Sequence, residues 1–260
     1  MKKVFPFLVL FLLGLVSVTA QESQPAAKGG RTILIFDASG SMWGKIGSEA
    51  KIEIARKTTL ELIKNRPAQL EMGLMAYGHR RKGDCDDIEI LVPPAIGNDQ
   101  ALTEAVKALT PRGKTPIYKS VLMAAESLAY TEEAASIILI SDGIETCGGD
   151  LKALGKQLAD KGVDFKTHII GFAMADEDTV QLRQLAKDTG GIYADAGDAE
   201  SLGKALKTAA EAAARPATTL TLVPLDSDGK SLLKNGVAFS VYRNKADETP
   251  VLTGKGGQWN

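Results

Sequence analysis

Strand-length apolar runs alternate with helix-length segments along most of this chain, and this alternation constrains the fold more than any other feature. The strand-like runs occupy residues 31–37, 70–77, 88–92, 135–141, 164–172 and 191–195. The helix-like segments occupy residues 48–64, 98–109, 116–130, 150–161, 176–189 and 199–214. Because each parallel crossover needs an intervening helix, this pattern predicts an α/β fold with a mostly parallel sheet and helices on both faces.

Local signals refine two element boundaries. Residues 88–92 follow the preceding strand after a loop too short to contain a helix, so we expect an antiparallel strand at the sheet edge. Pro93 and Pro94 are expected to end that strand. Ser48 is the expected N-cap of the first helix.

The N-terminus predicts export. Lys2 and Lys3 precede an apolar run over residues 4–18, and Val18-Thr19-Ala20 is a small-residue cleavage pattern. We therefore expect a signal peptide over residues 1–20, a polar tether over 21–30 and a periplasmic or secreted mature protein. The apolar run is short for a membrane span, so membrane attachment is expected only if the segment stays uncleaved.

The net charge argues against two kinds of polyanionic partner. The 260 residues carry a formal net charge of −1, which gives no electrostatic basis for binding nucleic acid or an anionic membrane surface. Hydrophobic residues make up 44% of the chain, which is ordinary for a globular protein.

The pattern changes after Arg215. Residues 219–222 and 237–242 alternate apolar and polar positions, and Asp228-Gly229 and Asn235-Gly236 indicate turns. We expect residues 31–215 to form the α/β domain and residues 216–260 a partial, β-sandwich-like extension. Since the extension is too short for a comfortable core of its own, we expect either a chain cut short within a small β domain or a β segment that packs on a partner.

The first strand ends in an oxygen-rich turn. Asp37, Ser39 and Ser41 follow the apolar run 33–36 at alternate positions, so a locally extended turn would direct their side chains to one side. One carboxylate and two hydroxyls form a site for a hard cation such as Mg²⁺ or Mn²⁺, because Zn²⁺ and Cu²⁺ prefer histidine and cysteine.

Two further residues complete a known pattern. Thr115 precedes the helix 116–130, and Asp142, followed by Gly143, ends the strand 135–141. Together with Asp37, Ser39 and Ser41, they resemble the metal-ion-dependent adhesion site of von Willebrand factor type A domains. The resemblance covers residues 31–214.

The resemblance implies a fold and a function. The fold would be a Rossmann-like, doubly wound sheet of six strands, with the third strand antiparallel at the edge and the first and fourth adjacent. Ser39, Ser41 and Thr115 would coordinate Mg²⁺, or Mn²⁺ or Ca²⁺, while Asp37 and Asp142 would contribute charge, often through water. An Asp or Glu of a protein partner would fill the remaining coordination position, which makes the expected activity binding rather than catalysis.

Other activities fit the sequence less well. The segment Arg112–Thr115 resembles the end of a phosphate-binding loop, but Ala108 stands where that loop needs glycine. An aspartyl phosphatase would have a second acid where Ser39 stands, and a serine hydrolase would need a base from His79 or His168. Two alternatives stay open: a scaffold or assembly subunit whose metal is not presented to a ligand, and a metal-assisted hydrolase.

The cysteines and the residues around the site complete the predictions. In an exported chain the pair Cys85 and Cys147 suggests one disulfide, and the strand order implied by the resemblance brings their loops within reach. Trp43, Arg80, Arg81 and Asp84 are expected at the rim of the site, where they would contact the partner. For Trp43, packing in the core is an equal alternative.

Overall fold

The structure, a computed structural model, describes residues 30–128, 135–160, 165–215, 238–241, 252–255 and 258–259. The chain divides into two compact units, Met1–Pro216 and Ala217–Asn260. The predicted signal peptide and nearly all of the predicted tether lie outside the described residues, so these two predictions stay predictions.

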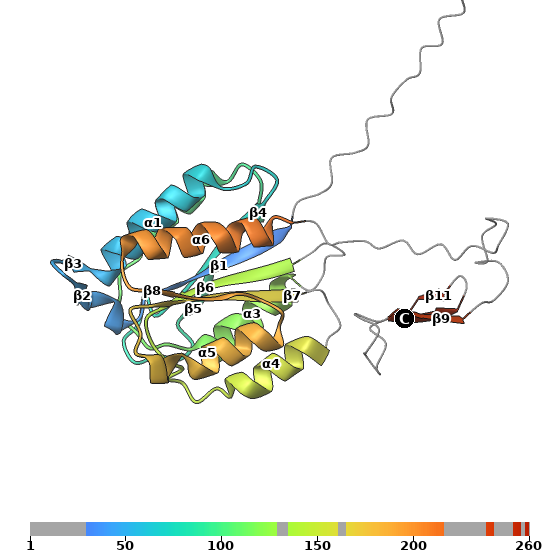
Figure 1. Ribbon diagram of the computed structural model, residues 1–260. Coiled ribbons are helices and arrows are strands. Elements are labelled where there is room, and N and C mark those ends of the chain that lie inside the picture. Colours follow the sequence, from blue (N-terminus) through green and yellow to red (C-terminus); the bar gives the residue numbers. More distant parts are fainter. Residues whose placement is uncertain are drawn as a thin grey trace, which may run out of the picture. The chain divides into compact units, whose positions relative to one another are not determined.

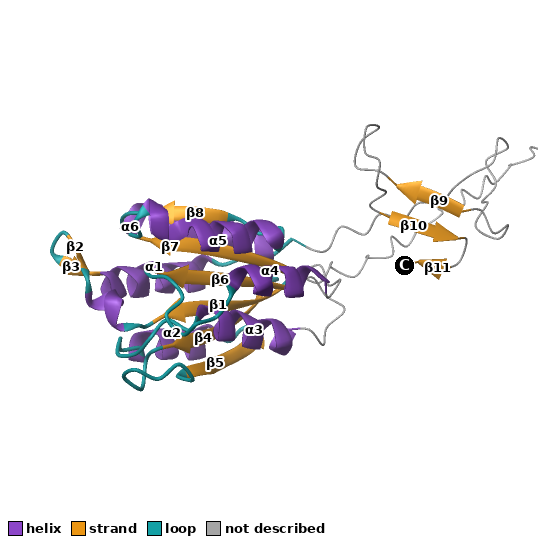
Figure 2. Ribbon diagram, turned by 90° about the horizontal axis from the view of Figure 1, so that it is seen from below, coloured by secondary structure: helices purple, strands orange, loops and turns teal. Residues whose placement is uncertain are grey.

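The first unit is built on a six-stranded sheet (Figures 1 and 2). Its strands are β1 (Arg31–Asp37), β4 (Glu71–Tyr77), β5 (Ile88–Ala95), β6 (Ala135–Ser141), β7 (Phe165–Phe172) and β8 (Tyr193–Ala196). They lie in the order β5-β4-β1-β6-β7-β8. Only β5, at one edge, runs antiparallel to its neighbour. The predicted α/β fold, with its antiparallel edge strand, is confirmed.

Helices cover both faces of this sheet. They are α1 (Lys51–Asn65), α2 (Asp99–Ala108), α3 (Ile117–Leu128), α4 (Leu151–Asp160), α5 (Asp176–Asp188) and α6 (Ala199–Ala213). Residues of α1, α2 and α6 pack in one hydrophobic core with Leu34 and Phe36, and those of α3, α4 and α5 pack in a second core with Ile33 and Ile35. Figure 1 shows α1 and α6 on one side of the sheet and α3, α4 and α5 on the other. Because β1 is buried on both faces, its sequence is a continuous apolar run.

The clearest differences from the predicted boundaries lie at three elements. A short helix η1 (Gly40–Trp43) and a hairpin of β2 (Lys45–Ile46) and β3 (Glu49–Ala50) follow β1, so Ser48 lies in the hairpin turn and Ala50 precedes α1 as its N-cap. Strand β5 continues through Pro93 and Pro94, since an edge strand tolerates residues without a donor. Strand β8 begins at Tyr193 rather than at residue 191.

The second unit contains a three-stranded antiparallel sheet. Its strands are β9 (Ala238–Val241), β10 (Leu252–Lys255) and β11 (Gln258–Trp259), in the order β11-β10-β9. Strand β9 lies within the predicted strand 237–242. The predicted strand 219–222 and both predicted turns lie outside the described residues.

Candidate metal centre

The sheet topology brings two aspartates to one point. Strands β1 and β6 are parallel neighbours, paired in register from Arg31 with Ala135 to Phe36 with Ile140. Asp37 is the last residue of β1 and Asp142 directly follows β6, so both lie at the carboxyl end of the sheet. This is also where the strand order reverses, the usual position of a ligand site in open α/β folds.

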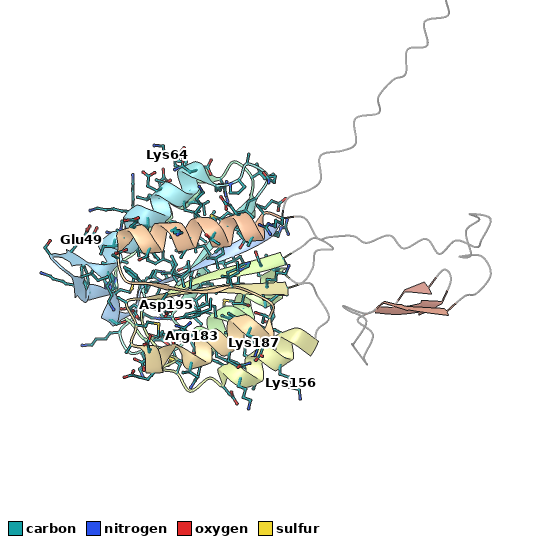
Figure 3. The ribbon with its side chains drawn as sticks, viewed as in Figure 1. Glu49, Lys64, Lys156, Arg183, Lys187 and Asp195 are labelled. Atoms are coloured by element: carbon teal, nitrogen blue, oxygen red, sulfur yellow. A yellow bond between two sulfur atoms is a disulfide. The ribbon has the colours of Figure 1, made fainter. Side chains whose placement is uncertain are left out.

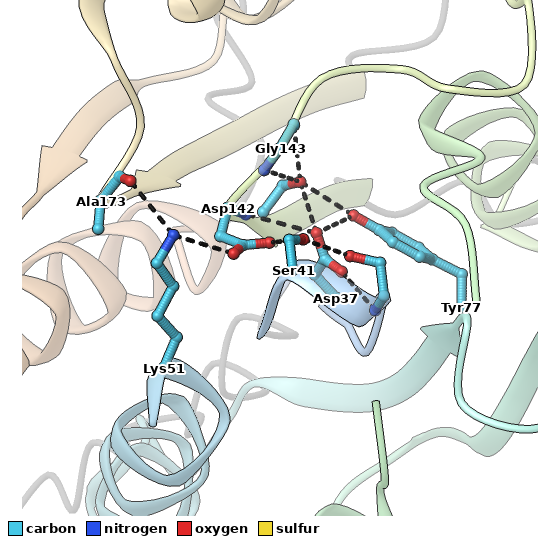
Figure 4. Close-up of polar contacts among 9 residues, drawn as sticks. Asp37, Ser41, Lys51, Tyr77, Asp142, Gly143 and Ala173 are labelled. Carbon is cyan, nitrogen blue, oxygen red and sulfur yellow. Dashed lines mark hydrogen bonds and ion pairs between the residues drawn. The ribbon is translucent and has the colours of Figure 1, made fainter. Parts of the chain in front are cut away.

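The turn after β1 joins these acids through two hydroxyl groups. The backbone N–H of Ser39 donates to Asp37 Oδ1 at 2.8 Å, and Ser41 Oγ donates to Asp142 Oδ1 at 2.6 Å (Figure 4). Ser39 Oγ lies 2.9 Å from Ser41 Oγ. Since the Ser41 hydrogen goes to Asp142, Ser39 donates to Ser41 in this contact. Four of the five predicted ligands therefore form one hydrogen-bonded chain.

Backbone contacts bring the fifth predicted ligand to the site. The N–H of Gly40 donates to the carbonyl of Gly113 at 3.0 Å, and the N–H of Arg112 donates to Ala38 at 3.0 Å. Thr115 lies two residues after Gly113 in the same loop. Its backbone N–H donates to Thr146 Oγ1 at 2.9 Å. A Cβ placed on Gly143 would lie 3.8 Å from Ser41 Oγ and 3.9 Å from Thr115 Oγ1, so the two hydroxyls border the same small space.

Asp37 is completely buried and receives several hydrogen bonds. Its Oδ2 accepts from Tyr77 Oη at 2.7 Å, from Ser141 Oγ at 2.8 Å and from the backbone N–H of Asp142 at 3.4 Å. Burial and, to a smaller extent, the negative charge of Asp142 raise the pKa of Asp37 to about 6. The centre thus holds two neighbouring carboxylates whose repulsion a bound cation would offset.

A lysine that the sequence did not indicate contacts this centre. Lys51 Nζ donates to Asp142 Oδ2 at 3.0 Å and to the carbonyl of Ala173 at 3.3 Å (Figure 4). Tyr77 and Ser141 were likewise not predicted as partners of Asp37. Ser141 directly precedes Asp142, and Tyr77 is a polar residue at the end of an apolar strand, so the sequence offered a weak indication of their role. It offered no such indication for Lys51.

The donor set fits a hard cation. It offers three hydroxyl oxygens and two carboxylates, which suit the oxygen coordination of Mg²⁺ or Mn²⁺. Within the described part of the chain, no three His, Cys, Asp or Glu side chains gather in a group that could hold a metal ion. The acid and imidazole clusters typical of transition-metal sites are therefore absent from that part.

A disulfide joins two loops at this end of the sheet. Cys85 in the β4–β5 loop is bonded to Cys147 in the β6–α4 loop, with their Cα atoms 5.7 Å apart. Strands β4 and β6 flank β1, so the bridge spans the strand that carries Asp37. The predicted disulfide is confirmed.

The predicted rim residues adopt different environments. Trp43 is 53% exposed, and its Nε1 donates to the carbonyl of Pro111 at 2.9 Å, so its ring is at the surface rather than in the core. Arg80 Nε binds Asp87 Oδ1 at 2.7 Å, and Arg81 Nε binds Asp84 Oδ2 at 2.8 Å. Both ion pairs form within the β4–β5 loop and stabilise it. The side chains of Arg80 and Arg81 remain 40% and 55% exposed.

Neither histidine contacts the five predicted ligands through a hydrogen bond within the described residues. His168 is buried in β7, where its Nδ1 accepts from the N–H of Ile192 at 3.2 Å. His79 Nε2 lies 3.3 Å from Glu89 Oε2. The structure places neither imidazole as the base that a serine hydrolase would need.

Comparisons with known proteins agree with this geometry. The family model for the von Willebrand factor type A domain matches residues 32–145. The uncharacterized protein YwmD of Bacillus subtilis (strain 168) is 32% identical over 216 residues, which cover 77% of this chain and 95% of the relative.

Solved structures show the same fold. The von Willebrand factor type A protein from Catenulispora acidiphila matches with a TM-score of 0.57 and 18% identity, over 72% of this chain and 43% of that one. The pilus adhesin SpaC from Lactobacillus rhamnosus GG matches with a TM-score of 0.59 and 17% identity, over 73% of this chain and 31% of that one. The chain spans less than half of either protein, so these likenesses concern the fold alone.

Proposed function

Because this chain belongs to the von Willebrand factor type A family, we propose that it is a binding module that captures a protein partner through a divalent cation. Ser39, Ser41 and Thr115 would hold Mg²⁺, with Mn²⁺ or Ca²⁺ as alternatives. Asp37 and Asp142 would supply negative charge, and a carboxylate of an Asp or Glu on the partner would complete the coordination.

One observation carries the proposal: three hydroxyl side chains from two separate loops converge beside two buried acids. The hydroxyls come from the turn after β1 and from the loop before α3, which the contact between Gly40 and Gly113 holds together. Asp37, Ser39, Thr115 and Asp142 are all buried, whereas Ser41 is exposed. The centre therefore has a closed side and a side that faces solvent.

The charge balance favours an anionic partner. Neutral hydroxyl ligands leave more of the charge of a bound cation uncompensated than a cage of carboxylates would. Both oxygens of Asp37 already accept hydrogen bonds from Ser39, Tyr77 and Ser141. This supports a role for Asp37 through charge and bridging water rather than as a direct ligand.

The surroundings support a role in recognition rather than turnover. Trp43 and Ile144 are both exposed, and each lies two residues after a proposed site residue, Ser41 and Asp142 respectively. Exposed aromatic and aliphatic side chains next to a charged anchor are typical of protein-binding surfaces. We include Arg80, Arg81 and Asp84 in the proposed partner-binding rim, since the disulfide fixes their loop beside the centre.

An exported location is part of the proposal. It is supported by the signal-peptide pattern in residues 1–20, by the disulfide and by the fold shared with a pilus adhesin. No helix among the described residues is long and apolar enough to cross a membrane.

The proposal is tested by comparing Thr115→Ala with Thr110→Ala. Both variants remove one hydroxyl from the same loop, but only Thr115 borders the centre. Titration of purified protein with Mn²⁺ by isothermal calorimetry measures metal binding. Capture of partners from an extract, with Mg²⁺ or with EDTA, measures recognition.

We expect Thr115→Ala and EDTA to abolish both metal binding and specific capture, and Thr110→Ala to retain both. Metal binding without any cation-dependent capture would favour the scaffold alternative, in which the cation is not presented. Absence of Mn²⁺ or Mg²⁺ binding to the unmodified protein would contradict the proposal.

A further inference from the structure

Lys51 is placed beside the candidate metal centre by the hairpin that precedes α1. It is the first residue of that helix, and its N–H donates to the carbonyl of Gly44 at 2.8 Å. Its aliphatic stem passes Gly44 closely, because a Cβ at residue 44 would lie 3.6 Å from Lys51 Cε. The loop between β1 and α1 thereby directs the ammonium group towards Asp142 (Figure 4).

The ammonium group is held on both sides. Nζ lies 3.0 Å from Asp142 Oδ2, and the two side chains are 15% and 0% exposed. Nζ also donates to the carbonyl of Ala173 at 3.3 Å. Ala173 has a φ of 51°, a left-handed conformation that residues other than glycine adopt rarely. This backbone conformation, directly after β7, turns the carbonyl towards the site.

We propose that Lys51 is a built-in counter-cation that sets how tightly the centre holds its metal and how strongly the metal attracts a carboxylate. The inference rests on the proposed function and assigns a specificity-determining residue to that site. Lys51 occupies Asp142 Oδ2, while Oδ1 accepts from Ser41. Each oxygen of Asp142 thus has a partner within the chain, and the ammonium group shares the negative charge that a cation would attract.

The charges explain the direction of the effect. Two carboxylates and one ammonium give the centre a net charge of about −1, so a divalent cation leaves it with about +1. Without Lys51 the two carboxylates would fully neutralise the charge of the same cation. Lys51 therefore weakens metal binding and strengthens the attraction for an anionic ligand such as the carboxylate of an Asp or Glu side chain.

An ordinary stabilising ion pair would behave differently. Removing Lys51 would then lower stability with and without metal, and the affinity for the cation would stay the same or fall. A counter-cation, by contrast, competes with the metal for the same negative charge, so its removal must raise the affinity for the metal.

The test compares Lys51→Met with Lys64→Met. Lys64 lies on the last turn of the same helix and points into solvent (Figure 3), so its substitution changes the net charge equally without touching the centre. Calorimetry gives the Mn²⁺ affinity, thermal unfolding with and without Mn²⁺ gives the stability, and paramagnetic broadening of the acetate resonance by the Mn²⁺-loaded protein reports carboxylate binding. Lys51→Arg, which keeps the charge, completes the series.

We expect Lys51→Met to bind Mn²⁺ at least about tenfold more tightly than the unmodified protein and to bind acetate more weakly. Lys64→Met and Lys51→Arg should resemble the unmodified protein. Should the metal-free Lys51→Met protein fail to fold, Mn²⁺ must restore the fold.

An unchanged or weaker Mn²⁺ affinity of Lys51→Met, or a variant that Mn²⁺ does not rescue, overturns the inference while leaving the proposed function intact. Absence of Mn²⁺ binding to the unmodified protein would overturn both this inference and the proposed function. Tighter Mn²⁺ binding with unchanged acetate binding contradicts the part that concerns ligand attraction.

Discussion

Tyr77 donates its hydroxyl hydrogen to Asp37 Oδ2 across 2.7 Å, and the two residues face each other in register as the last residues of β4 and β1. Both side chains are completely buried. Ser141 Oγ lies 3.0 Å from the same phenol oxygen and 2.8 Å from Asp37. The buried acid is therefore held by neutral donors from both neighbouring strands, which fix its position before any cation arrives.

The first prediction concerns this phenol group. Tyr77→Phe keeps the ring but removes a hydrogen bond to a buried carboxylate, so the free energy of unfolding should fall by about 1.5–3 kcal/mol. Urea denaturation at neutral pH measures the change. Tyr118→Phe is the control, since among the described residues that hydroxyl forms a single exposed contact, of 3.5 Å with Gln157. Equal stability of the Tyr77→Phe variant and the unmodified protein would show that the Asp37 network does not depend on the phenol.

The second prediction concerns the disulfide. Cys85 and Cys147 are separated by 62 positions, so in the chain-entropy model the bridge stabilises the fold by about 4 kcal/mol. Reduction should lower the unfolding free energy by up to this amount. The Cys85→Ala, Cys147→Ala double variant should already have the lower stability and should not respond to reductant. A response of the double variant would mean that the reductant acts elsewhere.

Much of the fold was predictable because it depends on local pattern. Strands β1 and β6 are buried on both faces, so their apolar runs are continuous and their ends are marked by Asp37 and Asp142. The five proposed ligands could be found because their spacing and order follow a family pattern. The hairpin of β2 and β3 was missed, since two-residue strands leave no alternation to detect.

The supporting contacts of the centre could not be predicted, because they are set by tertiary packing. Lys51 contacts Asp142 from the first residue of α1, and that helix begins at Lys51 rather than at the expected Ser48 because a hairpin precedes it. The contact between Gly40 and Gly113 joins segments that are distant in sequence, through backbone atoms that every residue has. The sequence therefore shows neither which acid Lys51 meets nor which carbonyl the N–H of Gly40 reaches.

The third prediction follows from that backbone contact. A Cβ on Gly113 would lie 2.8 Å from the carbonyl oxygen of Arg81 and 2.8 Å from Gly78 Cα, and neither backbone atom can move freely. Gly113→Ala should therefore destabilise the protein by about 1–3 kcal/mol and weaken Mn²⁺ binding by displacing Thr115. Gly197→Ala is the control, because a Cβ at that residue would meet no atom within 4 Å beyond its chain neighbours. Calorimetry and denaturation check both effects; an unaltered Mn²⁺ affinity would show that Thr115 does not need this contact.

The fourth prediction concerns His168 and the effect of pH on stability. Its Nδ1 accepts a hydrogen bond from Ile192, so the ring is neutral with its proton on Nε2, and Nε2 has no hydrogen-bond partner among the described residues. Burial, with a smaller effect from the charge of Lys166, lowers the pKa of His168 to about 4. In the unfolded chain the imidazole takes up its proton near pH 6.5.

Between pH 6.5 and pH 4 the unfolded chain therefore holds a proton on His168 that the folded chain does not, and the free energy of unfolding must fall as the pH falls through this range. The loss reaches at most about 3 kcal/mol near pH 4. His168→Asn retains an acceptor for Ile192 but does not titrate in this range, so its stability should fall less steeply from pH 6.5 to pH 4. Since all other titrating groups are common to the two proteins, the difference between their urea-denaturation curves isolates His168. Parallel curves would show that the folded chain protonates this imidazole as readily as the unfolded chain does.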